Sequence, residues 1–166
     1  GQVACAALCA GSRGVAEVEG SGMGVHRTED GGATGVRRNA CLASRNVIAV
    51  AAHTTQPDTV YVAVKEHGFY RSQDAGKSWR LMERKSQDGL QQLIHSDMAG
   101  SMQTGWLFAA TSKGIRRTVD CFCLWQDAGT LGTGGDAVTS DPGRRYHFFA
   151  VTEKGLFRSK DGGENW

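Results

Sequence analysis

The feature that most constrains this chain is a turn motif of the form Ser-x-Asp-x-Gly-x-x-Trp, which occurs twice. It spans Ser72–Trp79 and Ser159–Trp166, each time directly after a run of the form Gly-apolar-x-Arg. Two partial copies stand in the same register, at Thr28–Gly35 and Thr118–Trp125. The glycines that lead the four copies are 44, 46 and 41 residues apart: Gly24, Gly68, Gly114 and Gly155. A period in the forties with short strand-like runs is typical of the blades of a β-propeller.

The residue types of the motif suit a tight turn. Asp74 is placed to accept hydrogen bonds from backbone N–H groups of its own turn, and Ser72 can add a hydroxyl contact. Gly76 can take a positive φ without steric cost. Trp79 offers a large apolar wedge between neighbouring sheets, with one N–H to satisfy. The equivalent residues of the second complete copy are Ser159, Asp161, Gly163 and Trp166.

The two partial copies depart from this pattern at definable places. Gly35 replaces the tryptophan of the first, and Phe122 stands where the other needs a glycine. We therefore expect both turns to be looser or differently shaped. The positions that they keep are Thr28, Asp30, Thr118, Asp120 and Trp125.

These motifs resemble the Asp-box, or bacterial neuraminidase repeat, of sialidases, xyloglucanases, sortilin-type receptors and some photosystem assembly factors. The resemblance covers nearly the whole chain as four repeats, the last without its outer strand: residues 1–39, 40–85, 86–128 and 129–166. It implies a β-propeller or propeller segment of about four antiparallel four-stranded blades, and slightly favours a secreted or periplasmic protein. It places each box on the turn between the third and fourth strands, away from the substrate face. The box is then a folding device, although a catalytic or calcium-binding role for Asp74 or Asp161 is the alternative.

The runs between the boxes predict an all-β chain, because none has a helical period. The expected strands are residues 3–8, 14–19, 24–28 and 36–39; 47–52, 59–64, 68–72 and 79–83; 90–96, 106–111, 114–118 and 124–127; and 137–140, 146–152 and 155–159.

Composition excludes several classes of function. The 166 residues suit about one domain, and the net charge of +2 indicates no particular partner. No basic patch alternates with aromatic residues as a nucleic-acid groove requires. No apolar run approaches the roughly 18 residues of a membrane span. The apolar run at residues 3–10 lacks a charged lead-in and is too short for a whole signal peptide.

An arginine occupies the same place in every repeat: Arg27, Arg71, Arg117 and Arg158. One interpretation is a cluster that binds the carboxylate of a sialic acid, since arginine forks suit carboxylates. In the other, each side chain covers apolar surface between blades with its stem and keeps its guanidinium in water. Equivalent positions in successive blades point to separate sectors of a ring, which favours the second interpretation.

The five cysteines and five histidines do not predict a metal site. The pairs Cys5/Cys9 and Cys121/Cys123 could be half-sites for a thiolate-bound metal, but neither has the usual spacing of two intervening residues. Structural or free cysteines are the favoured interpretation. The histidines form no i, i+4 pair, although His53 and His95 occupy similar first-loop positions. We expect no metal ion and no cofactor.

Glycoside hydrolysis would need two carboxyl groups about 5–10 Å apart across the substrate. The family resemblance puts the loops between second and third strands, and those joining blades, on the substrate face. The candidate carboxylates in these loops are Glu66, Asp88, Asp127 and Glu153, each of which can equally be a solvated loop charge. The Arg-Ile-Pro motif of sialidases is absent, and no nucleophilic tyrosine with a carboxylate partner can be placed. The enzyme interpretation therefore rests on family analogy.

Two classes of function remain. The favoured one is a non-catalytic propeller segment that binds a protein or a glycan through its loop face, or acts as a scaffold. The alternative is a fragment of a glycoside hydrolase of the sialidase or xyloglucanase type. Propellers close with about four to eight blades, so an open arc would leave apolar faces and a strand edge unpaired. We therefore expect a homodimer, or docking against other chains, through the first and last repeats.

Overall fold

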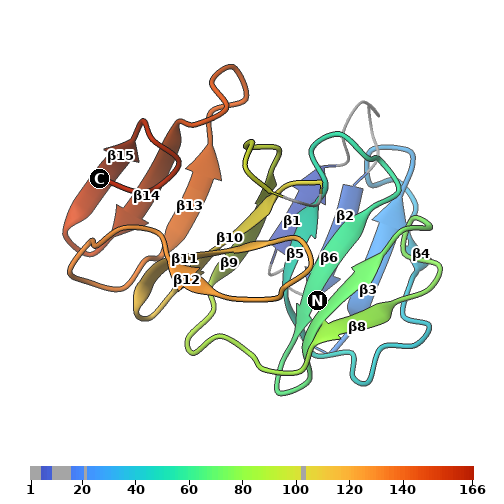
Figure 1. The fold of residues 1–166 in the computed structure, drawn as a ribbon. Coiled ribbons are helices and arrows are strands. Elements are labelled where there is room, and N and C mark those ends of the chain that lie inside the picture. Colours follow the sequence, from blue (N-terminus) through green and yellow to red (C-terminus); the bar gives the residue numbers. More distant parts are fainter. Residues whose placement is uncertain (1–4, 9–15, 21, 102–103) are drawn as a thin grey trace. The chain divides into compact units, whose positions relative to one another are not determined.

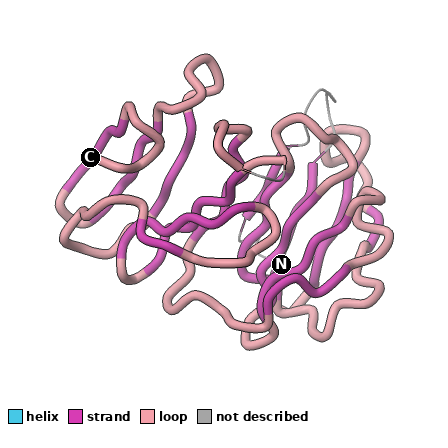
Figure 2. Tube along the Cα trace, in the orientation of Figure 1, coloured by secondary structure: helices cyan, strands magenta, loops and turns pink. Residues whose placement is uncertain are grey.

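A computed structural model of the chain describes residues 5–8, 16–20, 22–101 and 104–166 (Figure 1). The described residues form fifteen strands and no helix (Figure 2). Each strand pairs in antiparallel fashion with its neighbour in the sequence, so every sheet is a meander. The predicted fold class, an all-β segment of a propeller, is confirmed. The chain divides into two compact units, Gly1–Ser86 and Gln87–Trp166, which are described separately.

The first unit contains two four-stranded sheets, ordered β1-β2-β3-β4 and β5-β6-β7-β8. Apolar side chains from both sheets, among them Val25, Val62 and Trp79, form one buried cluster. The strands are β1 (Cys5–Leu8), β2 (Ala16–Gly20), β3 (Gly24–Thr28), β4 (Val36–Arg37), β5 (Val47–Ala52), β6 (Val60–Val64), β7 (Gly68–Ser72) and β8 (Arg80–Glu83).

The second unit contains a four-stranded sheet, β9-β10-β11-β12, and a three-stranded sheet, β13-β14-β15. Phe108 of the first sheet packs on Phe148 of the second, with ring centroids 4.3 Å apart, at the centre of a second buried cluster. The strands are β9 (Gln92–Ser96), β10 (Trp106–Thr111), β11 (Gly114–Val119), β12 (Gln126–Asp127), β13 (Ala137–Ser140), β14 (Phe148–Thr152) and β15 (Gly155–Ser159).

Six strands have the predicted bounds: β3, β5, β7, β10, β13 and β15. The differences lie at strand ends: β2 and β11 extend one residue further than predicted, whereas most of the others lose terminal residues to turns and loops. For example, His147 N–H donates to Arg144 O (2.9 Å), so residues 146–147 belong to a turn before β14. Likewise, Thr59 N–H donates to Gln56 O (3.1 Å), and β6 begins one residue later than predicted. Residues 3–4 and 14–15 of the predicted first two strands lie outside the described residues.

The structure explains why a glycine leads every repeat. Gly24, Gly68, Gly114 and Gly155 each begin the third strand of a sheet with a positive φ, of 76°, 89°, 121° and 122°. At Gly68 a Cβ atom would also lie 1.9 Å from the backbone oxygen of Glu83. Both the backbone conformation and the contact require a residue without a side chain.

Candidate functional site

The turn at Ser72–Trp79 joins β7 to β8 and is closed by its own side chains. Gly76 N–H donates to Ser72 Oγ (2.8 Å), and the Ser72 hydroxyl donates to Asp74 Oδ1 (2.7 Å). The backbone N–H and the hydroxyl of Ser78 donate to the two oxygens of Asp74, at 2.9 and 2.6 Å. These donors, the Ser78 hydroxyl above all, lower the pKa of Asp74 to about 2. Asp74 therefore faces its own turn and points its charge at donors that the turn supplies.

The same bonds close two further turns. In the last box Gly163 N–H donates to Ser159 Oγ (2.9 Å), and Asn165 donates to both oxygens of Asp161 (3.0 and 2.8 Å). In the first box Gly32 N–H donates to Thr28 Oγ1 (2.8 Å), and Thr34 donates to both oxygens of Asp30 (2.8 and 2.6 Å). The Thr34 hydroxyl is the main cause that lowers the pKa of Asp30 to about 2, and the Asn165 side chain is the main cause that holds the pKa of Asp161 well below its usual range.

The expectation of a looser first turn is therefore wrong as regards its hydrogen bonds. The network needs a hydroxyl, a carboxylate and two backbone donors at the first, third, fifth and seventh positions. Thr28, Asp30, Gly32 and Thr34 supply all four. Gly35, at the eighth position, takes no part in it.

The tryptophans of the complete boxes reach the preceding sheet. Trp79 Nε1–H donates to the backbone oxygen of Arg38 (2.6 Å), and Trp166 Nε1–H donates to that of Ala128 (2.7 Å). Arg38 and Ala128 are equivalent residues, since each directly follows the outer strand of its sheet, β4 or β12. Within each unit, the box of one sheet is thus joined to the sheet before it.

The turn at Thr118–Trp125 is built differently. Phe122 is buried and has a φ of 58°, so it holds the left-handed conformation that glycine holds in the other boxes. Its N–H donates to Val119 O (2.9 Å) and not to the hydroxyl of Thr118. Asp120 accepts a hydrogen bond from the Thr104 hydroxyl (2.5 Å), outside the turn. This turn is differently shaped, as the loss of its glycine led us to expect.

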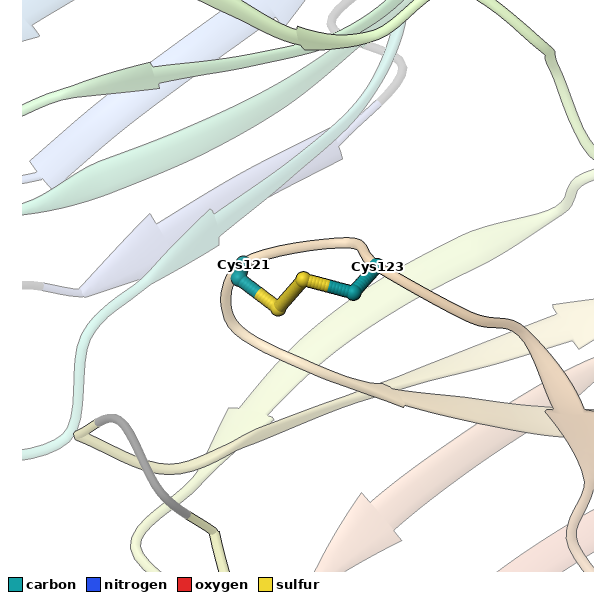
Figure 3. Close-up of a disulfide and its surroundings, with 2 residues drawn as sticks. All are labelled: Cys121 and Cys123. Atoms are coloured by element: carbon teal, nitrogen blue, oxygen red, sulfur yellow. A yellow bond between two sulfur atoms is a disulfide. The ribbon is translucent and has the colours of Figure 1, made fainter.

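A disulfide joins Cys121 to Cys123 across the same turn (Figure 3). The two sulfurs are bonded to each other, so this pair does not offer two thiolates to a metal ion. Cys41 is free and exposed. Cys9 and the side chain of Cys5 lie outside the described part of the chain.

The arginine of the third repeat is not solvated in the way the sequence led us to expect. Arg117 is 8% exposed, and its guanidinium donates to Gly162 O (2.8 Å) and to the carboxylate of Glu164, both in the next box. It also lies over the ring of Trp106, 5.4 Å from the centroid. Arg27, in the first unit, pairs with Glu29 of its own box (3.3 Å). Arg117 and Arg27 thus have different partners. This difference supports the prediction that the arginines lie in separate sectors of the propeller, and it does not favour a single cluster that binds a carboxylate.

A pocket of about 360 Å³ lies in the second unit, on loops of both types that were predicted to form the substrate face. It is lined by the β10–β11 turn, including Ser112 and Lys113, and by Asp127 with the loop at residues 129–134. Lys154 Nζ donates to the backbone oxygen of Gly132 in this loop (2.8 Å). The lining is therefore mostly backbone and polar side chains.

Three of the four candidate carboxylates lie at this pocket. Asp127 lines it. Asp88 and Glu153 accept hydrogen bonds at 2.8 Å from two lining residues, Lys113 and Thr133. Glu66 is elsewhere, exposed in the β6–β7 turn of the first unit, where its φ is 62°.

The carboxylates at the pocket are open to water. Asp88 and Asp127 are 75% and 78% exposed, and each pairs with a cation, Lys113 Nζ at 2.8 Å and Arg116 Nε at 3.2 Å. Glycosidases usually keep one carboxyl group protonated by placing it in an apolar environment. Such an environment is missing around these two side chains.

Sequence reasoning missed the rest of the pocket. Lys113, Thr133 and Lys154 were not singled out, since isolated lysines and threonines in loops carry no motif. The one available signal was the glycine-rich run at residues 129–135, Gly-Thr-Leu-Gly-Thr-Gly-Gly, which joins the third repeat to the fourth.

The described residues contain no group of three His, Cys, Asp or Glu side chains that could hold a metal ion. His53 Nδ1 accepts hydrogen bonds from the N–H groups of Thr55 and Gln56 (both 3.1 Å), so this histidine shapes its own loop. Among the same described residues there is no helix long and apolar enough to cross a membrane.

No protein-family model and no curated protein matches the chain. Solved structures do match. All of this chain superposes on 24% of an ancestral GH74 enzyme, with a TM-score of 0.74 and 17% identity. For the GH74 enzyme of Niastella koreensis, 97% of this chain covers 28% of that chain, with a TM-score of 0.71 and 16% identity.

YCF48 in a complex with D1 peptide matches over 99% of this chain and 53% of its own, with a TM-score of 0.68 and 17% identity. The chain thus spans about a quarter of the GH74 structures and about half of the YCF48 structure. It has the fold of a β-propeller segment like those of GH74 enzymes and YCF48.

Proposed function

We propose that this chain is a non-catalytic propeller segment that binds a protein partner through the pocket of its second unit. The observation that carries the proposal is the pocket itself, which presents backbone groups, threonines and Lys113 on the loop face, with Lys154 bonded to its loop. Such groups suit the main chain and carboxylates of an extended peptide. The match to YCF48, whose structure holds a D1 peptide, shows that a related fold takes a peptide ligand.

Peptide selection with the purified chain tests this proposal. The immobilised protein is panned against a random linear peptide library displayed on phage, and enriched peptides are titrated by calorimetry. Lys113→Ala combined with Lys154→Ala removes two cations at the pocket and should weaken binding at least several-fold. Lys160→Ala removes another exposed lysine, from the last box, and serves as the control. Failure to enrich any peptide, or equal loss in the control, would contradict the proposal.

Glycoside hydrolysis is the second candidate, and it is favoured by one observation: Asp88, Asp127 and Glu153 gather around one pocket. The assay is turnover of xyloglucan and sialylated oligosaccharides by the whole chain. An enzyme would lose turnover in Asp88→Asn, Asp127→Asn or Glu153→Gln. It would keep turnover in Glu66→Gln, because Glu66 does not line this pocket. Our proposal expects no turnover in the unmodified chain.

A further inference from the structure

The last sheet exposes a face whose equivalents are buried elsewhere in the chain. Ile115, the second residue of β11, is 2% exposed, whereas Leu156, at the same place in β15, is 71% exposed. Their cross-strand neighbours differ in the same way, since Ala110 is fully buried and Val151 is 45% exposed. In the described residues of the second unit, the face of β14 and β15 thus repeats the side chains of a blade interface without a covering sheet.

The third repeat shows what covers such a face. The guanidinium of Arg117 donates to the backbone oxygen at the fourth position of the next box, Gly162, and to the carboxylate at its sixth position, Glu164. The tryptophan that ends this box, Trp166, donates to the backbone oxygen of Ala128. The third sheet thus contributes the guanidinium of Arg117 and the backbone oxygen of Ala128 to this interface. The Asp-box turn contributes a backbone oxygen, a carboxylate and an indole N–H.

Arg158 stands at the position of Arg117 and is exposed. We propose that Arg158 and the exposed face of β14 and β15 are a docking surface for an Asp-box blade with an acidic residue at the sixth position of its box and a tryptophan at the eighth. The acidic residue supplies the charge that complements Arg158. The tryptophan and the sheet behind it cover Leu156 and Val151.

A second copy of this chain is a poor occupant. The first box has Ala33 and Gly35 at the two positions, so it offers neither the carboxylate nor the indole. The second and third boxes have Lys77 and Cys123 at the sixth position, and Lys77 would repel Arg158. Glu164 of the last box already pairs with Arg117. The occupant is therefore a blade with a sequence other than residues 1–166.

An extended chain tests this surface. A second copy of residues 126–166 is joined after Trp166, so that it supplies an outer strand next to β15 and a box with glutamate and tryptophan at the required positions. Arg158→Glu should leave the urea midpoint of the 166-residue chain unchanged and lower that of the extended chain. In the extended chain that carries Arg158→Glu, the appended copy of Glu164 is then replaced by arginine. This second change should restore the urea midpoint, because the two charges have exchanged places.

The matched control is Arg117→Glu, which should lower the midpoint of both chains. An equal effect of Arg158→Glu on both chains, or no restoration by the charge exchange, would overturn the proposal. If the appended repeat fails to fold, as judged by amide exchange, the surface does not accept such a blade and the proposal is likewise overturned. Sedimentation velocity of the 166-residue chain provides a further test: self-association abolished by Arg158→Glu would show that a second copy is the occupant.

Discussion

The complete boxes at Ser72–Trp79 and Ser159–Trp166 and the divergent box at Thr118–Trp125 share one left-handed residue but hold it by different means. The residue at the fifth position has a positive φ in all three: 78° at Gly76, 87° at Gly163 and 58° at Phe122. In the complete boxes a hydroxyl and a carboxylate hold this shape from within. In the divergent box a buried phenyl ring and a disulfide occupy the turn. The comparison indicates that the left-handed residue is the fixed requirement and that the side-chain network is one way to meet it.

The first box has one of the two parts of the motif, the hydrogen-bond network, and lacks the other, the tryptophan. It keeps the full hydrogen-bond network of Thr28 and Asp30 but has Gly35 where the others have tryptophan. We infer that the network closes the turn and that the tryptophan joins the turn to the preceding sheet. Substitutions can then remove the closure of the turn and its attachment to the preceding sheet separately.

Loss of a tryptophan should have the largest effect. Trp79 is 5% exposed and belongs to the core cluster of the first unit, so Trp79→Ala should cost about 3–5 kcal/mol of unfolding free energy. Trp79→Phe keeps a ring but loses the N–H donated to Arg38 O, and should cost less. Urea unfolding measures both. Equal losses would show that the hydrogen bond, and not the apolar ring, joins the turn to the sheet.

Loss of the aspartate should distinguish the two kinds of box. Asp74→Ala removes the acceptor of the N–H and hydroxyl of Ser78, both exposed to water, and should cost about 0.5–1.5 kcal/mol. Asp120→Ala should cost less, because it removes a buried carboxylate whose desolvation is unfavourable. Denaturant midpoints of the two variants, with Lys77→Ala as an exposed control, provide the measurement. Asp120→Ala as the more damaging change would contradict the comparison.

Reduction should affect the divergent box alone. Replacing Cys121 and Cys123 by serine, or adding a reductant, should cost roughly 1–2 kcal/mol through the small loop that the disulfide closes. Cys41→Ser is the control, since Cys41 is free and exposed. A midpoint unchanged by reduction would mean that Phe122 alone holds the turn.

Low pH should reduce the stability that the complete boxes and the first box contribute to the fold. The pKa values of Asp30 and Asp74 are lowered to about 2 in the folded chain, from an ordinary value near 4. Their contribution to stability is therefore complete above about pH 4 and is lost as the pH falls toward 2. Asp74→Asn should flatten the dependence of unfolding free energy on pH in this range. An unchanged slope would show that the carboxylate charge does not stabilise the turn.

The sequence predicted the fold well because the repeat has local causes. A leading glycine with a positive φ, an alternating strand and a turn with its own donors are all visible within about twenty residues. Six of the fifteen strands consequently have the predicted bounds. Strand ends were less predictable, since the turn before β14 depends on backbone bonds such as that between His147 and Arg144.

The candidate site was predictable only in part. Asp88, Asp127 and Glu153 were named from their loops, but nothing in the sequence indicated that one pocket gathers them and leaves Glu66 out. The environment of Arg117 was also missed, because it depends on Gly162 and Glu164, more than forty residues away in the chain. Local patterns predict turns, whereas contacts between repeats require the fold.

Native-state amide exchange tests the central comparison most directly, since it requires no substitution. The backbone N–H at the seventh position of a box is bonded to aspartate at Thr34, Ser78 and Asn165. At Leu124, the same position of the divergent box, the N–H has no hydrogen-bond partner among the described residues. We expect slow exchange at the first three amides and fast exchange at Leu124. A Leu124 amide as protected as that of Ser78, or three box amides that all exchange as fast as Leu124, would contradict the account.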